Sequence, residues 1–280
     1  MRRIINLCAL ICAITITSCK EHNITSYRDY GLNIPVKSIK VTTYEAESKF
    51  GEIVKGDREY NGHYTTIFND EGLVISTTTY NYYGDTMEVT KHKYNDDDNI
   101  INVTNYNKDG KINYETKWTY DGDHVKSVTT TNYWDDTPIT HEQQFIYDGR
   151  TIVEEHIFRN GTLICVNKFT NYDKDGAKWV SHNADGTEQI NGYYTLNKAR
   201  KYTQYACDDI QFQIKWDENN SPIETKNAEV DQNGATYYYK EGANLFFEYE
   251  YDNKGNWIKQ IVFEGDMRTP LTISERKIVY

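Results

Sequence analysis

The stretch VTNYNKDGKINYETKWTYDGDHVKSVTTTNY, residues 103–133, contains the pattern that decides the fold. From Ile112 to Tyr120, apolar or aromatic residues alternate with polar ones. This period of two residues is that of a β-strand with one aromatic face and one polar face. The next segment, Val125–Tyr133, is rich in Thr, Val and Tyr, which favour strands. Glycine-containing turns precede both segments, so the stretch predicts a chain of hairpins.

The turn of this stretch recurs along the chain. An aromatic or apolar residue is followed by three mostly polar residues and then by Gly, Asp or Asn, with a turn about every 12 residues, which is the spacing of consecutive hairpins. Gly and Asn tolerate positive φ, and Asp and Asn side chains accept hydrogen bonds from the N–H groups of the turn. Copies include FNDEG (68–72), YNDDD (94–98), YNKDG (106–110), YDKDG (172–176) and YDNKG (251–255).

These features predict an all-β fold. We expect an antiparallel meander of repeated β-hairpins, with about 16–18 short strands. The meander forms a single sheet that is curled or rolled so that its Tyr-rich face is covered, and a sandwich or a barrel is the alternative. The chain has 25 Tyr and five Trp, and such large side chains supply apolar area that a Leu-poor core lacks. Only Glu45–Val54 has the character of a short helix.

The N-terminus has the layout of a secretory signal peptide. Arg2 and Arg3 precede an apolar run that ends at Ile16-Thr17-Ser18-Cys19. These four residues resemble the bacterial lipobox, which implies cleavage before Cys19 and a diacylglycerol on its sulfur. The expected organisation is a lipoprotein signal peptide at 1–18, a flexible lipidated tether at 19–36 and a β-hairpin repeat domain at 37–280.

A family resemblance rests on the turn unit YDNKGN at 251–256. It resembles the tyrosine-aspartate (YD) repeat of the RHS family, and the looser copies resemble hairpin-repeat lipoproteins of Bacteroidota envelopes. The resemblance covers about residues 60–265. It implies a wall of β-hairpins and, with the lipobox, an outer-membrane lipoprotein of the cell envelope that is periplasmic or exposed at the surface.

Charge narrows the range of partners. The formal charge is -11, and removal of residues 1–18, which hold two Arg and no acidic residue, makes it -13. An acidic protein has no means of neutralising a row of phosphates, so we expect no nucleic-acid partner. The expected partners are the membrane, through the N-terminal lipid, and an unidentified protein or glycan.

Few residues have the spacing of a reactive site. No His pair, nucleophile elbow or phosphate-binding loop is present, so we expect neither catalytic residues nor a cofactor. Asn105, Asn107 and Asp109 match the start of a calcium loop, although a hairpin turn explains the same letters with fewer assumptions. Cys165 and Cys207 either form one disulfide or are two separate buried thiols.

The sequence therefore predicts a lipid-anchored, non-enzymatic envelope protein that binds a protein or glycan through its sheet surface. The ligand-binding residues are not identifiable from the sequence. Two alternatives remain open. The first is a secreted polysaccharide hydrolase, because a chain with so many Asp and Glu residues can contain the pair of carboxylates that a glycosidase uses. The second is an immunity or antitoxin-like partner of a secreted toxin.

Overall fold

The computed structural model describes residues 26–134, 137–173, 175–198, 201–207, 210–219, 221–230, 237–265 and 269–280. This part of the chain contains one short 3-10 helix, η1 (Tyr27–Tyr30), and one antiparallel sheet of 19 strands. The strands are β1 (Ser38–Lys49), β2 (Glu52–Arg58), β3 (His63–Phe68), β4 (Val74–Tyr80), β5 (Thr86–Tyr94), β6 (Ile100–Asn107), β7 (Ile112–Asp121), β8 (His124–Asn132), β9 (Ile139–Asp148), β10 (Thr151–Arg159), β11 (Thr162–Asp173), β12 (Gly176–Asn183), β13 (Glu188–Leu196), β14 (Tyr202–Cys207), β15 (Ile210–Trp216), β16 (Pro222–Val230), β17 (Tyr237–Tyr251), β18 (Trp257–Glu264) and β19 (Thr269–Val279).

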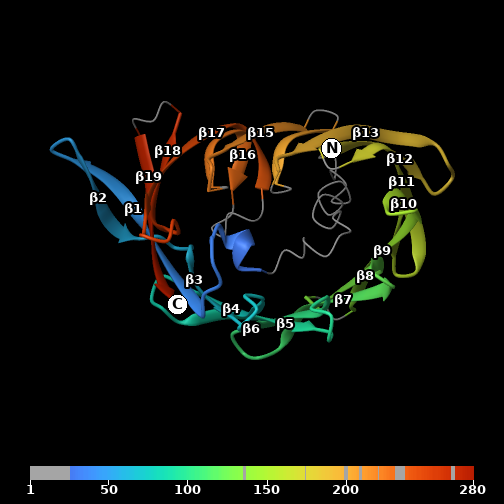
Figure 1. The fold of residues 1–280 in the computed structure, drawn as a ribbon, viewed down its shortest axis with the longest axis horizontal. Helices are drawn as coiled ribbons and strands as arrows, with labels where there is room; N and C mark the ends of the chain where they lie inside the picture. The colour runs from blue at the N-terminus through green and yellow to red at the C-terminus, as the bar shows by residue number, and fades with distance from the viewer. Residues whose placement is uncertain are drawn as a thin grey trace.

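The sheet closes on itself (Figure 1). From β3 to β19 each strand pairs with the next, and β1 pairs with both β19 and β3. Lys40 of β1, for example, lies opposite Lys277 of β19 and Thr65 of β3. Eighteen strands therefore form a barrel, and β2 pairs with β1 alone among the described strands. The predicted meander of hairpins is confirmed, and its form is the barrel alternative rather than an open, curled sheet.

The β1–β2 hairpin extends outside the ring of strands (Figure 1). It includes Glu45–Val54, for which the predicted short helix was wrong. Phe50 and Gly51 have φ of 55° and 85°, so the backbone reverses there instead of continuing a helical turn. On either side of this turn, Glu47 lies opposite Val54 and Lys49 lies opposite Glu52 in the ladder.

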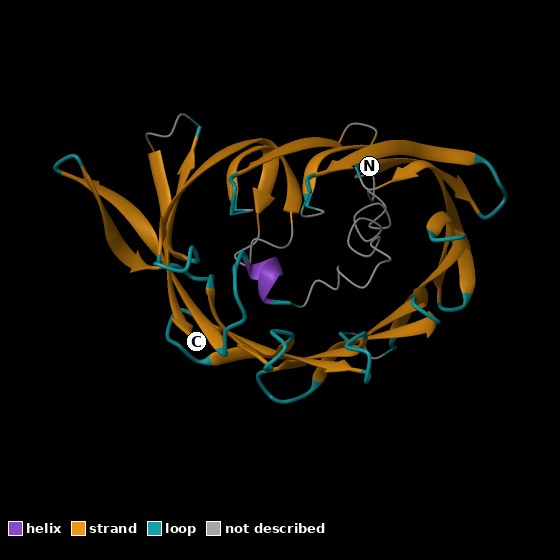
Figure 2. Ribbon diagram, in the orientation of Figure 1, coloured by secondary structure: helices purple, strands orange, loops and turns teal. Residues whose placement is uncertain are grey.

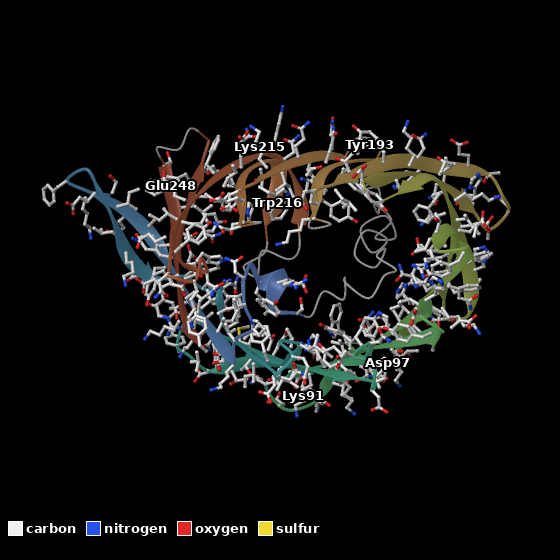
Figure 3. The ribbon with its side chains drawn as sticks, in the orientation of Figure 1. Lys91, Asp97, Tyr193, Lys215, Trp216 and Glu248 are labelled. Carbon is white, nitrogen blue, oxygen red and sulfur yellow. The ribbon has the colours of Figure 1, made fainter. Side chains whose placement is uncertain are left out.

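The two faces of the barrel have different compositions. Figure 3 shows Trp216 on the inner side of the ring and its neighbour Lys215 on the outer side. Because residues paired across an antiparallel ladder share a face, the assignment extends from strand to strand. The inner face carries the main core, which consists of Val128, Phe145, Ile152, Phe169, Ala177, Trp179, Tyr194, Tyr205, Cys207, Phe212 and Ile214.

Residues 26–36 lie inside the ring, where Figure 2 shows η1. Leu32 and Val36 are 3% and 4% exposed, and they pack with inward residues that include Tyr64 and Trp257. The tether prediction is therefore corrected for this segment. Its apolar residues are too few for a periodic pattern, yet Leu32 and Val36 are buried against the barrel wall, whereas Ile34 is exposed. No helix of the described residues has the length and apolar character to cross a membrane.

One turn geometry recurs in the hairpins, and we call it the capped turn. Its first residue is Asn or Asp, whose side-chain oxygen accepts the backbone N–H of the residue four positions later. In the turns that begin at Asn69, Asn81, Asn107 and Asp252, Gly occupies the fourth position with positive φ, and in the turn that begins at Asn95, Asp98 takes that position with φ 61°. The copies begin at Asn69, Asn81, Asn95, Asn107, Asn197, Asp217 and Asp252.

The turns lie at the two ends of the barrel. We define the first rim as the loops that follow β3, β5, β7, β9, β11, β13, β15 and β17. The second rim consists of the loops that follow β2 and the other even-numbered strands. The described chain starts at the first rim, because Ser26 bridges Leu73 and the Tyr27 N–H donates to the Gly72 carbonyl at 2.8 Å.

Candidate functional site

The predicted cysteine sites lie in separate places. Cys19 is outside the described residues, so its lipidation stays a prediction. Cys165 on β11 and Cys207 on β14 are both buried and are not joined by a disulfide. Three strand spacings of about 4.8 Å separate the two strands, whereas a disulfide needs Cα atoms within about 7 Å. Of the two alternatives, one disulfide or two separate buried thiols, the structure shows the second.

The calcium candidates are engaged in protein hydrogen bonds. Asn105 is buried and faces inward, where its Nδ2 donates to Thr90 Oγ1 at 3.0 Å and its Oδ1 accepts from Asn113. Asn107 Oδ1 accepts the N–H groups of Asp109 and Lys111, each at 3.0 Å. Among the described residues, no group of three His, Cys, Asp or Glu side chains is placed to hold a metal. The contacts of Asn107 are those of a capped turn, and the contacts of Asn105 join side chains of neighbouring strands.

Aromatic side chains join neighbouring turns of the first rim. The hydroxyl of Tyr94 donates to the carbonyl of Val74 at 2.8 Å, and that of Tyr120 donates to Ile100 at 2.7 Å. In each case the acceptor is the first residue of the strand that leaves the preceding turn of this rim. We call this contact the turn lock. Trp216 and Tyr249 make the same contact with Tyr202 and Pro222, and Tyr147 donates to Val125, the second residue of β8.

A buried charge lies under residues 26–36. Arg276 is 4% exposed, its guanidinium lies 3.3 Å from the centroid of the Trp257 ring, and its Nη1 donates to the Tyr30 carbonyl at 2.9 Å. Burial lowers its pKa. Beside it, Asn33 donates from its N–H to Asn256 Oδ1 at 2.7 Å. Together these contacts attach the N-terminal segment to the inner wall.

Carboxylates of this region cap turns. Asp217 accepts the Ser221 N–H at 2.8 Å and the Tyr251 hydroxyl at 2.5 Å. Burial and this hydrogen bond raise the pKa of Tyr251 to about 12. Lys201 lies 5.0 Å from the centroid of the Trp216 ring, and burial lowers its pKa. The arrangement holds the loops together, and its carboxylate and hydroxyl are bonded to one another.

A second polar group lies across the barrel on β9, β10 and β11. Glu155 has no exposed surface, and its two oxygens accept hydrogen bonds from Gln143 at 2.8 Å and Asn167 at 2.7 Å. On β5, burial lowers the pKa of His92 to about 4. Its Nδ1 is buried without a hydrogen-bond partner among the described residues. Glu155 is thus satisfied by amides, and His92 is held neutral at pH 7.

The second rim exposes large aromatic side chains. Tyr60, Tyr83 and Trp134 are 69%, 83% and 72% exposed, and they occupy the loops after β2, β4 and β8. None of the three was predicted as a site residue from the sequence. The signal that was available is a pair of adjacent aromatics within a turn, Tyr82-Tyr83 and Tyr133-Trp134, where one aromatic suffices for the turn pattern.

The first rim has a different surface. Its turns expose acidic side chains, whereas its aromatic residues are turned inward by the turn locks. The exposed acidic residues of its described turns are Asp70, Glu71, Asp96, Asp97, Asp98, Asp121, Asp123, Asp148, Asp175 and Glu218. The turns of the second rim also expose acidic residues, among them Asp85, Asp109 and Asp185, so the two ends of the barrel are distinguished by the exposed aromatics of the second rim.

No family model matches the chain, and no curated protein matches it. Solved structures similar to it include a porin-like protein from Bacteroides uniformis, with a TM-score of 0.39 and 10% identity over 88% of this chain and 98% of that one. A porin-like protein from Bacteroides vulgatus has a TM-score of 0.27 and 14% identity over 87% and 98%. A putative 6-phosphogluconolactonase from Bacteroides fragilis has a TM-score of 0.22 and 13% identity over 87% and 98%. At such scores and identities the likeness assigns no function to this chain.

Proposed function

We propose that this chain is a lipid-anchored, non-enzymatic protein of the bacterial cell envelope whose barrel stands in water and binds a protein or glycan partner. The N-terminal lipid, rather than the barrel wall, attaches it to the outer membrane. The observation that carries the proposal is the charge on the outer face of the strands.

Charged side chains occupy the middle of the strands on this face. Lys215 of β15 pairs with Glu224 of β16 at 2.5 Å, and Lys259 of β18 pairs with Glu250 of β17 at 2.6 Å. Across the barrel, outward Lys117 lies 2.7 Å from Glu115 on β7. Further outward-facing charges are Lys91, Lys93, Glu142, Glu154, Lys168, Lys178, Lys226, Glu248, Glu275 and Lys277.

A bilayer does not accommodate such a wall. A membrane barrel needs an apolar outer band about 25 Å tall, and a Lys or Arg at its midplane costs about 2–4 kcal/mol. The charges here occur on both sides of the ring, so the wall forms no continuous band of this kind. Water solvates these side chains without cost, and their ion pairs are ordinary surface contacts.

The lipobox supplies the means of attachment. Seven residue steps join Cys19 to Ser26, and a fully extended chain covers at most about 25 Å in that length. Because Ser26 lies at the first rim, a lipid on Cys19 would keep that rim close to the membrane. The carboxylates with resolved contacts cap turns, pair with Lys or His on the strands, or accept hydrogen bonds from buried amides, which supports a non-enzymatic role.

Cell fractionation tests the proposal. The native chain is expected in the membrane fraction, labelled by a fatty-acid analogue and released only by detergent. A chain with Cys19→Ala, in which residues 1–18 are replaced by an ordinary cleavable signal peptide, is expected unlabelled in the aqueous fraction. If this variant still requires detergent, the barrel itself is in the membrane. If the native chain is unlabelled, the lipid anchor is wrong.

A further inference from the structure

We propose that the exposed aromatics of the second rim, Tyr60, Tyr83 and Trp134, form a binding surface for a neutral polysaccharide. The inference rests on the proposed function and names the ligand class and the site. These side chains expose 69%, 83% and 72% of their surface, whereas Trp179, Trp257 and Tyr205 are buried on the inner wall. Each is therefore available for contact, and none is needed to fill the core.

Their spacing suits a long, narrow ligand. The three residues lie in loops of one arc of the rim, after β2, β4 and β8. Adjacent turns of one rim are two strand spacings apart, about 10 Å, so Tyr83 and Trp134 are separated by about 20 Å along the rim. An extended glycan presents flat sugar faces at intervals along such a length, and Tyr and Trp offer flat apolar rings with polar edges.

The surface between the aromatics favours a glycan over a protein. The turn between Tyr83 and Trp134 carries Lys108 and Asp109, both exposed. The centre of a protein interface is depleted of charge and buries about 800 Å² per partner. Isolated aromatics separated by charged turns lack that dry centre. A hydroxyl-rich chain, in contrast, remains solvated over the charged turns while individual sugars stack on the rings.

A hydrogen-bond donor lies between two of the aromatics. Arg58, two residues before Tyr60, has Nη1 3.9 Å from the place that a Cβ would take on Gly84, the residue after Tyr83. Its Nε is buried without a hydrogen-bond partner among the described residues. Of the guanidinium nitrogens, it is Nη1 that lies beside the turn of Tyr83, where it would donate to a hydroxyl of a ligand that bridges Tyr60 and Tyr83.

Charge and position further define the ligand. The mature charge of -13 repels acidic glycans, so the ligand is a neutral polysaccharide. The proposed anchor lies at the opposite rim, about 25 Å away along the barrel axis for strands of ten residues tilted by about 40°. The second rim would reach the bilayer only if the chain between Cys19 and Ser26 were fully extended. A glycan in the surrounding water is the partner that this orientation favours over a lipid surface.

Affinity electrophoresis of the detergent-solubilised mature lipoprotein tests the inference, with dextran, laminarin, xyloglucan and galactomannan as probes. We expect retardation by at least one of them, and a loss of affinity of at least tenfold in the triple variant Tyr60→Ala, Tyr83→Ala, Trp134→Ala. Arg58→Gln is expected to weaken the same interaction several-fold.

Phe50→Ala is the matched control, because Phe50 is fully exposed but lies on the β1–β2 hairpin outside the ring. Its affinity is expected to equal that of the native chain. Absence of retardation by all four polysaccharides, or an unchanged affinity of the triple variant, would overturn the inference. So would retention on phosphatidylethanolamine vesicles that depends on the three aromatics. None of these results alters the fatty-acid labelling, so failure of the site and failure of the anchor remain distinguishable.

Discussion

Two turns with nearly the same sequence, one at each rim, direct their Tyr side chains to opposite faces of the barrel wall. In YNDDD at 94–98, Tyr94 faces the interior and locks the preceding turn through its hydroxyl. In YNKDG at 106–110, Tyr106 faces outward and lies 5.5 Å from Lys91 Nζ. Asn95 and Asn107 cap the two turns in the same way. The local structure is the same, and only the side of the wall differs.

The geometry of a closed meander explains this difference. A turn made of L-residues is chiral, so every capped turn presents its aromatic on the same hand of the hairpin. A turn of the second rim is related to a turn of the first rim by half a full rotation about an axis that runs along the circumference of the barrel. This rotation also exchanges the inner and outer faces of the wall. One repeated turn therefore stabilises the interior at one rim and supplies surface aromatics at the other.

The largest effect expected from this comparison concerns one Trp at each rim. Trp257, at the first rim, is 6% exposed and contacts Arg276, so Trp257→Ala is expected to lower the free energy of unfolding by about 3–5 kcal/mol. Trp134→Ala, at the second rim, is expected to change it by less than about 0.5 kcal/mol. Urea unfolding monitored by far-UV circular dichroism measures both. Equal losses would contradict the assignment of the rims.

Acid sensitivity is expected from the inner face near the first rim. Because burial lowers the pKa of His92 to about 4, the unfolded chain takes up this proton from about pH 6.5 downward, before the folded chain does. Stability is therefore complete above pH 6.5 and falls as the pH is lowered toward 4. His92 accounts for a loss of about 2.5 kcal/mol at pH 4.5.

His92→Leu removes this contribution. The difference in unfolding free energy between pH 7 and pH 4.5 is expected to be about 2.5 kcal/mol smaller in the variant than in the native chain. Urea titrations at the two pH values give this difference, and the comparison cancels the titration of the carboxylates that both chains share. Identical pH dependence in the two chains would show that His92 is not buried.

A smaller effect isolates the turn lock. Tyr120→Phe deletes the hydrogen bond to the Ile100 carbonyl and leaves that acceptor without its donor, so we expect a loss of about 1 kcal/mol. Tyr106→Phe is the matched control at the second rim, with an expected change near zero. Thermal unfolding of the two variants and of the native chain measures both changes in stability. A loss at Tyr106 as large as that at Tyr120 would remove the distinction between the rims.

Calcium is expected to have the smallest effect. Asn105 faces the interior and Asn107 caps its own turn. The Oδ1 atoms of both residues therefore already accept hydrogen bonds from protein groups. Neither millimolar calcium nor EDTA is expected to change the midpoint of thermal unfolding. A rise with calcium that Asn107→Ala abolishes would restore the calcium-loop interpretation.

Much of the architecture follows from the sequence because it is local. Alternation predicts a strand over Ile112–Tyr120, and β7 spans Ile112–Asp121. The turn pattern predicts a reversal at YNDDD (94–98), and Asp96, Asp97 and Asp98 are exposed in a capped turn between β5 and β6. Turn chemistry and the two-residue period depend only on neighbours, so a single chain suffices to predict them.

The features that depend on closure could not be predicted. Pairing of β1 with β19 joins residues more than two hundred positions apart, and no local pattern marks them as partners. Without closure there is neither an inside nor an outside, so Tyr94 and Tyr106 look equivalent in the sequence. The same holds for residues 26–36, which read as a tether because the wall that buries Leu32 and Val36 comes from distant strands.

Closure is tested most directly by joining the two ends of the meander. Lys40 and Lys277 face outward and lie opposite one another in the β1–β19 ladder, at the Cα spacing of about 4.5–5.5 Å that a disulfide bridges. In a closed barrel, the double variant Lys40→Cys, Lys277→Cys is expected to form an intramolecular disulfide under mild oxidation, whereas Lys40→Cys with Lys259→Cys, on the next strand, is not. A reduced Lys40→Cys, Lys277→Cys chain under the same conditions would mean that the sheet is open.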